Sequence, residues 1–224
     1  RRMMEFFVHY WSILLKGILE TLYMVFVSTA FAYILGMPLG VIMVTTAPNG
    51  IRPNKPVNDT LGTVINVGRS IPFVILIVAI IPFTRLIVGK AFGSTAAIVP
   101  LVIAAAPFVA RMVESSLAEI NPGVVEAAQT MGATDWQIVW KVLLPESVPS
   151  LVRGLSITTI TLVGYSAMAG AVGGGGLGAI AINYGYYRFQ TDMLYVTVVL
   201  MIFLVQIIQM AFNFVAKRID KRNR

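Results

Sequence analysis

The sequence is short of the residues that soluble enzymes rely on, and each shortage removes a class of function. It has no cysteine, which excludes disulfides, thiolate zinc sites and Cys nucleophiles. Its one histidine, His9, leaves no histidine-based metal cluster or catalytic triad. No G-x-x-x-x-G-K-[ST] loop occurs, because the glycines at 173–178 are followed by Ala179 and Ile180. We therefore expect no catalytic residue, no metal site and no cofactor on this chain, and no hydrolysis of ATP by it.

Charged residues are also scarce, and apolar residues take their place. Only 12% of the 224 residues are charged, whereas 57% are hydrophobic and the mean hydropathy is +0.81. Such a composition cannot cover a water-facing surface, so lipid must cover much of it. The sequence predicts an all-α integral membrane protein with five transmembrane helices and a long polar loop between spans three and four.

The expected organisation has three parts. An N-terminal flank occupies residues 1–20, a transmembrane domain residues 21–216 and a basic tail residues 217–224. The second span contains Pro72, Pro82 and Arg85, whose long side chain can reach the interface. The first apolar run is too long for a cleavable signal peptide. The spans are expected at about 21–46, 70–89, 93–112, 151–172 and 193–216, with the long loop at 114–149.

The positive charge of +7 reports orientation in the membrane rather than a nucleic-acid partner. With the C-terminus inside, the 47–69 loop holds three basic residues, the 111–153 loop three and the tail five, which is 11 of 17. We therefore predict a cytoplasmic C-terminus and an outside N-terminus. The tail residues are Lys217, Arg218, Lys221, Arg222 and Arg224.

Glycines mark two places where helices approach closely or end. Gly36 and Gly40 form a small-xxx-small pair around Pro38, which favours close packing against another helix. The run Gly173–Gly176 is too flexible for a packed span, so we expect it to end or break the fourth helix.

The 114–149 loop carries strong local signals for two short helices. Asn121 followed by Pro122 predicts a helix start, and Gly132 predicts a left-handed stop. Thr134 is positioned to cap a second helix, which should end just before Pro145. This unit is too short to span a membrane, so it should dock against a partner or form a cap on its own helix bundle.

This loop resembles the EAA signature of permease subunits in binding-protein-dependent ABC importers. The matching residues are Glu126-Ala127-Ala128, then Gly132, and after nine intervening residues Val142-Leu143-Leu144-Pro145; the signature usually has isoleucine at the position of Val142. Four further segments, at 68–73, 81–89, 106–114 and 162–168, are similar to the permeases of methionine importers.

The resemblance implies a homodimer in a bacterial inner membrane, which imports methionine. Its implied partners are two copies of a cytoplasmic ABC ATPase, which bind ATP and Mg²⁺, and an external methionine-binding lipoprotein. The loop would dock in a groove of the ATPase and transmit its closure. The alternative for Glu126 is a solvated helix charge. The coupling residues are then Glu126, Ala127, Ala128, Gly132, Leu144 and Pro145.

The fourth span is the candidate lining of the substrate pathway, because hydroxyl groups gather just before its glycine break. We select Tyr165, Ser166 and Met168, the last as a soft gate against its symmetry mate. Hydrogen bonding between helices or within the helix, or ordinary packing, would explain the same residues. Spans one, three, four and five have no interior charge, which argues against ion coupling. A permease for another small solute and a channel-type pore remain as alternatives.

Overall fold

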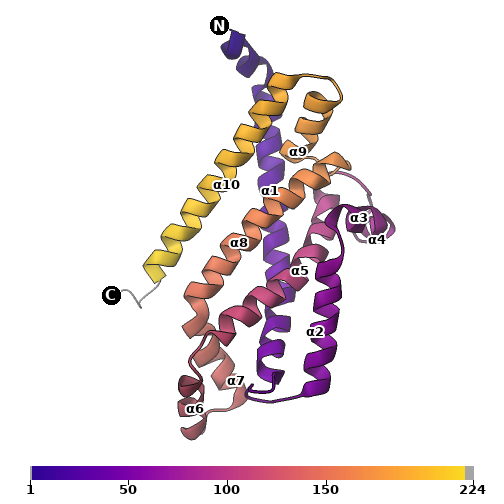
Figure 1. Ribbon diagram of the computed structural model, residues 1–224. Helices are drawn as coiled ribbons and strands as arrows, with labels where there is room; N and C mark the ends of the chain where they lie inside the picture. Colours follow the sequence, from indigo (N-terminus) through magenta and orange to yellow (C-terminus); the bar gives the residue numbers. More distant parts are fainter. Residues whose placement is uncertain (1, 220–224) are drawn as a thin grey trace. The chain divides into compact units, whose positions relative to one another are not determined.

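The computed structural model describes residues 2–219, with side chains from Tyr10 onward, and every regular element in that range is helical (Figure 1). The all-α prediction is therefore confirmed. Of the basic tail, Lys217 and Arg218 lie in the last turn of the final helix, and residues 220–224 lie outside the described range. The elements are α1 (Arg2–Thr46), α2 (Lys55–Ser70), α3 (Phe73–Ala79), α4 (Ile81–Val88), α5 (Ser94–Ala118), α6 (Pro122–Thr130), α7 (Asp135–Ile138), the π-helix η1 (Val139–Leu143), α8 (Leu144–Ala171), α9 (Gly176–Ile180), the π-helix η2 (Ala181–Tyr186) and α10 (Thr191–Ile219).

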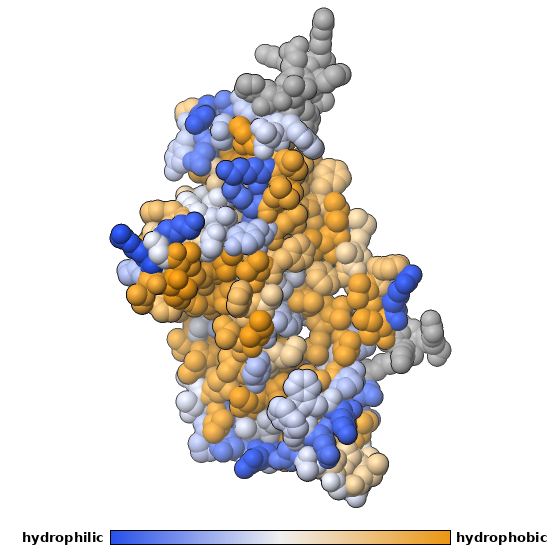
Figure 2. Space-filling view, turned by 180° about the vertical axis from the view of Figure 1, so that it is seen from behind, coloured by the Kyte–Doolittle hydropathy of each residue, from blue (hydrophilic) through white to orange (hydrophobic). Residues whose placement is uncertain are grey.

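Four helical stretches of the described chain are long and apolar enough to cross a membrane. They are Tyr10–Thr46, Ser94–Ala118, Asp135–Tyr186 and Thr191–Ile219. A fifth is added if α2 and α3 count as one broken span, bent by 95°. Much of the visible surface is correspondingly hydrophobic (Figure 2). In α10 only 11% of the most apolar window is buried, as expected for a helix that faces lipid.

The segment predicted as the second span differs from the prediction of one helix over 70–89. It forms α3 and α4, which have seven and eight residues and are each too short to cross. Pro72 precedes α3 and Pro82 lies in the first turn of α4, where a missing N–H is tolerated. Gly89, with φ of +77°, ends α4 in the left-handed conformation. The position of the second span thus stays a prediction.

The chain divides into two compact units. Unit 1 comprises Arg1–Ala30, Pro72–Ile103 and Thr159–Ile208, and unit 2 comprises Phe31–Ile71, Ala104–Thr158 and Gln209–Arg224. Large side chains with at most 1% exposure form the interior of unit 1, among them Leu14, Met24, Leu101, Leu162, Leu177 and Met193. In unit 2, Met43, Ile65 and Ala110 form a buried cluster, against which Leu39 and Leu61 pack.

The glycine pair on α1 allows close contact with α5 inside unit 2. A Cβ atom at Gly36 would lie 2.6 Å from the carbonyl oxygen of Ala106, and one at Gly40 would lie 2.6 Å from that of Ala110. The Gly40 Cβ would also lie 2.6 Å from Cβ of Val113. Only hydrogen fits at these positions, so the close packing predicted from the small-xxx-small pair is confirmed.

Candidate functional site

The first helix of the 114–149 loop, α6, begins at the predicted cap. The side chain of Asn121 accepts a hydrogen bond from the backbone N–H of Gly123 at 2.9 Å, and Pro122 occupies the first turn. None of the residues of α6 is buried within the chain. A nine-residue helix without a buried face gains little from its own chain, which leaves its surface free for a partner.

The turn after α6 depends on Gly132. Its φ is +79°, in the left-handed region that costs other residues free energy. Its N–H donates to the carbonyl of Gln129 at 2.9 Å, and the N–H of Ala133 donates to that of Ala128 at 3.1 Å. These bonds satisfy carbonyls at the end of α6. The predicted left-handed stop is confirmed.

The second helix, α7, begins with a complete capping box. Thr134 Oγ1 accepts from the N–H of Gln137 at 3.4 Å, and Gln137 Oε1 accepts from the N–H of Thr134 at 3.0 Å. Asp135 lies in the first turn, where a negative charge is favoured by the helix dipole. The cap at Thr134 was predicted. The part played by Gln137 was missed, although the Thr-x-x-Gln spacing signals it.

The prediction that the second helix ends before Pro145 is wrong. The chain passes from α7 through η1 directly into α8, so Pro145 and Pro149 lie within a continuing helix. The N–H of Leu144 donates to the carbonyl of Val139, five residues earlier, which is the wider π pattern. Widening the helix here relieves the clash between a proline ring and the carbonyl four residues before it. The coupling residues Leu144 and Pro145 thus begin α8.

A groove of about 470 Å³ lies beside α6, entirely within unit 2. Two carboxylates, Glu114 and Glu126, line it. Glu114 pairs with Arg111, which also donates to Asn66 Oδ1 at 2.9 Å. Glu126 makes no ion pair within the described residues and is exposed. It is therefore available to a cation from outside the chain. The lining residues include Thr45, Asn49, Ile51, Leu117, Ile120, Val125, Gln129 and Leu143.

An apolar face stands exposed on the same loop. Met131 is 85% exposed, Trp136 70% and Trp140 54%, and the two indole rings lie 5.5 Å apart. By contrast, Ile138 on α7 is fully buried. Exposed tryptophans next to each other are typical of contact surfaces. The sequence predicted Trp136 only as an apolar helix position, and Trp140 was missed.

The three predicted pathway residues lie together near the end of α8, in unit 1. The ring of Tyr165 stacks on Phe73, with centroids 4.7 Å apart and planes at 4°. Ser166 is buried and donates to the carbonyl of Val163 at 2.7 Å, the bonding within the helix that was the alternative explanation. Met168 is 46% exposed. The coupling residues belong to unit 2, so the structure does not group the two sets.

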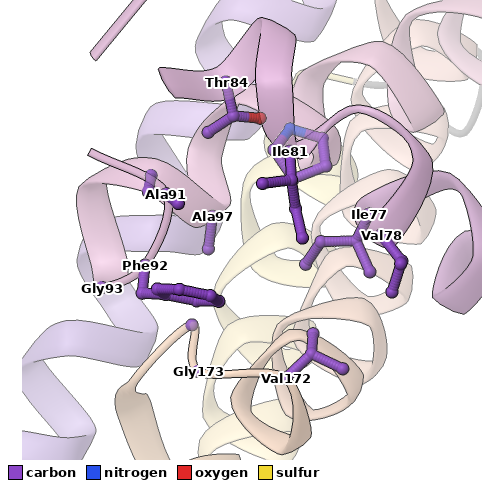
Figure 3. A pocket seen from close by; sticks show the side chains of 13 residues that line it. Ile77, Val78, Ile81, Thr84, Ala91, Phe92, Gly93, Ala97, Val172 and Gly173 are labelled. Atoms are coloured by element: carbon purple, nitrogen blue, oxygen red, sulfur yellow. The ribbon is translucent and has the colours of Figure 1, made fainter. Parts of the chain in front are cut away.

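The glycine run ends α8 at Ala171, as predicted, and α9 begins at Gly176. Gly173, Gly175 and Gly176 have φ of +90°, +83° and +74°. Beside this turn is a small cavity, shown in Figure 3, with about 20 Å³ of space. Thr84 lines it, and its buried hydroxyl has no hydrogen-bond partner in the described residues. This volume fits a water molecule and not an amino acid.

Metal binding finds no support in the part of the chain from Tyr10 to Ile219. No group of three or more His, Cys, Asp or Glu side chains gathers there.

The known proteins that are similar to this chain are membrane components of transport systems. Residues 36–224 match the family described as "Binding-protein-dependent transport system inner membrane component". The chain is 55% identical to the "Probable D-methionine transport system permease protein MetI" of Vibrio cholerae, over 94% of each chain. It is 54% identical to the "D-methionine transport system permease protein MetI" of Escherichia coli K12, over 70% of this chain and 73% of that one.

Among solved structures, the chain resembles one described as "Inward facing conformations of the MetNI methionine ABC transporter". The TM-score is 0.93 at 49% identity, covering 95% of this chain and 98% of the other. A crystal structure of an amino acid ABC transporter with histidines has a TM-score of 0.78 at 18% identity, covering 94% and 96%, and shows a shared fold only.

Proposed function

The chain belongs to the family of binding-protein-dependent transport system inner membrane components, and from this membership we propose that it is the permease subunit of an ATP-driven methionine importer. The resemblance stated from the EAA signature is confirmed by the relatives, which are permease proteins of transport systems. The chain is thus a transport subunit of the inner membrane, and hydrolysis of ATP belongs to a separate subunit.

One observation carries the choice of methionine. The chain shares 49% identity and a TM-score of 0.93 with a solved methionine ABC transporter chain over almost its whole length. The relatives that are 55% and 54% identical are D-methionine permeases. A permease for another small amino acid is the remaining alternative, and transport without ATP would indicate a channel.

Two copies of the chain would form the pathway. The cavity of about 20 Å³ beside Gly173 is too small for methionine. Met168 is 46% exposed and stands on the apolar end of α8, where a second copy would face it. Tyr165, Ser166 and Met168 are the residues that we assign to this pathway.

The 114–149 loop would couple the permease to its ATPase. The support is the exposed α6, the unpaired carboxylate of Glu126 and the tryptophan pair Trp136 and Trp140. Ala127 and Ala128 have small side chains, so a partner can approach the helix backbone closely. Gly132 sets the path of the chain between α6 and α7, and Leu144 and Pro145 set it where α8 begins.

The coupling function requires this loop to lie in the cytoplasm. We propose that the C-terminus is cytoplasmic and the N-terminus outside, in agreement with 11 of the 17 basic residues on the inner side. The outer ends of the helices would then receive the methionine-binding lipoprotein.

Reconstitution tests the proposal. The permease, its ATPase and its binding protein are placed in liposomes, and uptake of labelled methionine is measured with ATP, without ATP, and with an ATPase variant that cannot hydrolyse it. We expect uptake only in the first case, with unlabelled methionine competing and other amino acids failing to compete. ATP-independent uptake, or competition by another amino acid in place of methionine, would contradict it.

A further inference from the structure

The turn after α8 is bound by two side chains of α1, 156 residues away along the chain and within the same unit. The backbone N–H of Gly176 donates to Glu20 Oε2 at 2.8 Å. The next N–H, that of Leu177, donates to Thr21 Oγ1 at 2.9 Å. Since Gly175 supplies no side-chain cap to α9, these two bonds satisfy amides that the local sequence leaves open.

The contact leaves room for nothing larger than glycine. A Cβ atom at Gly175 would lie 2.9 Å from Glu20 Oε2, and one at Gly176 would lie 2.7 Å from Thr21 Oγ1. Both glycines also have positive φ. The turn is therefore shaped to bring its backbone against the carboxylate and the hydroxyl.

On its other side, α9 packs directly on the end of α8. A Cβ atom at Gly178 would lie 2.4 Å from the carbonyl oxygen of Ala167, and one at Gly170 would lie 2.3 Å from the amide nitrogen of Ala179. The two helices touch backbone to backbone, so neither can shift without moving the other. Met168 lies between these contact points in the sequence.

Glu20 is the last residue of the predicted N-terminal flank, directly before the first predicted span at 21–46. It lies in the candidate membrane span Tyr10–Thr46, and its side chain is 29% exposed. The cation in reach is Lys16, whose Nζ is 3.9 Å away and whose side chain is 77% exposed. The nearer partner of its carboxylate is the backbone N–H of Gly176, which donates to Glu20 Oε2 at 2.8 Å.

We propose that Glu20 and Thr21 are positioning residues that hold the glycine turn and α9 in place, and thereby hold the end of α8 and Met168 in position. This inference rests on the proposed function for the role of α8, because only a transport pathway gives the position of Met168 a consequence. The hydrogen bonds to the turn stand without it.

The absence of cysteine in the chain offers a direct probe of the turn. Val172→Cys places a unique thiol in it, and the rate of maleimide labelling of that thiol is measured in the permease–ATPase complex in nanodiscs. Glu20→Ala should raise the rate roughly tenfold, the factor expected from loss of one charge-assisted hydrogen bond. Glu20→Gln retains an acceptor oxygen and should restore most of the protection. The matched control is Leu19→Ala, on the same helix with a side chain 59% exposed.

The second measurement is the flux of labelled methionine in liposomes without ATP. Glu20→Ala should raise this flux roughly tenfold while co-elution with the ATPase stays unchanged, and Leu19→Ala should not raise it. If the Val172→Cys protein is labelled at the same rate with Glu20→Ala as with Glu20 unchanged, the inference is overturned whatever the substrate. A rise in labelling without a rise in flux would overturn the link to α8. Failure of the wild-type complex to take up methionine would overturn the proposed function alone, since the labelling result is independent of it.

Discussion

Gly132 is the residue at which the coupling role is most directly tested. Its φ of +79° is costly for other residues, yet a Cβ atom there would meet nothing within 4 Å. Gly132→Ala therefore adds backbone strain without a clash, about 1–2 kcal/mol. That strain lowers the population of the native turn about 5- to 30-fold relative to alternatives, and the affinity for the ATPase should fall by up to that factor.

A series of substitutions separates the effect of φ from other effects. Gly132→Asn should weaken binding less than Gly132→Ala, because asparagine tolerates the left-handed conformation. Gly132→Pro should abolish binding, since proline fixes φ near −65° and removes the N–H that donates to Gln129. The control is Gly164→Ala: a Cβ atom at Gly164 also meets nothing within 4 Å, but its φ is not positive.

The assay is titration of the purified ATPase onto permease held in nanodiscs, with each variant checked for membrane insertion. Native affinity for Gly132→Pro would refute the reasoning, because the turn would then have no part in the contact. A loss of affinity in Gly164→Ala equal to that in Gly132→Ala would show that any glycine replacement disturbs the complex, and would refute it as well.

Three other substitutions test separate features. Gly40→Val should lower the melting temperature in detergent, with a cost of about 1–3 kcal/mol, because its side chain meets the backbone of Ala110; a melting temperature equal to wild type would contradict the close packing. Thr84→Val should change stability by less than about 1 kcal/mol, since no group among the residues that the structure describes bonds its hydroxyl, and a larger loss would reveal a partner. Met168→Ala should raise the flux of methionine without ATP, and unchanged flux together with unchanged uptake would assign Met168 to packing.

Signals confined to a few neighbouring residues were predictable from the sequence. Asn121, Gly132 and Thr134 act through their own backbone and the next turn, so local chemistry sufficed to place them. The glycine run was predictable for the same reason. For the glycine pair on α1 the spacing predicted close packing against a helix, but not that this helix is α5. The continuation of the helix through Pro145 was not predictable. A proline normally ends a helix, and here a π-helix before it lets the chain stay helical on both sides of the ring.

Contacts between distant segments could not be found from the sequence. Glu20 precedes its partner Gly176 by 156 residues, and no local pattern links them. The exposure of Trp136 was missed because apolar residues at helical spacing predict a buried face, and a docking surface has the same composition. The prolines at 72 and 82 were visible in the sequence, but the division of this segment into the two short helices α3 and α4 was not.

The π-helix η1 also has a geometric consequence for the loop. Each residue of an α-helix turns the chain by about 100° around the helix axis. The extra residue of a π turn therefore rotates the preceding part of the helix by about that angle relative to the part that follows. Here the offset leaves Trp136 outward while Ile138 and Leu143 remain buried. Deletion of one residue within Val139–Leu143 would restore a plain helix and rotate the tryptophan face by roughly a quarter turn. The number of residues in this segment therefore determines the direction in which the tryptophan face points.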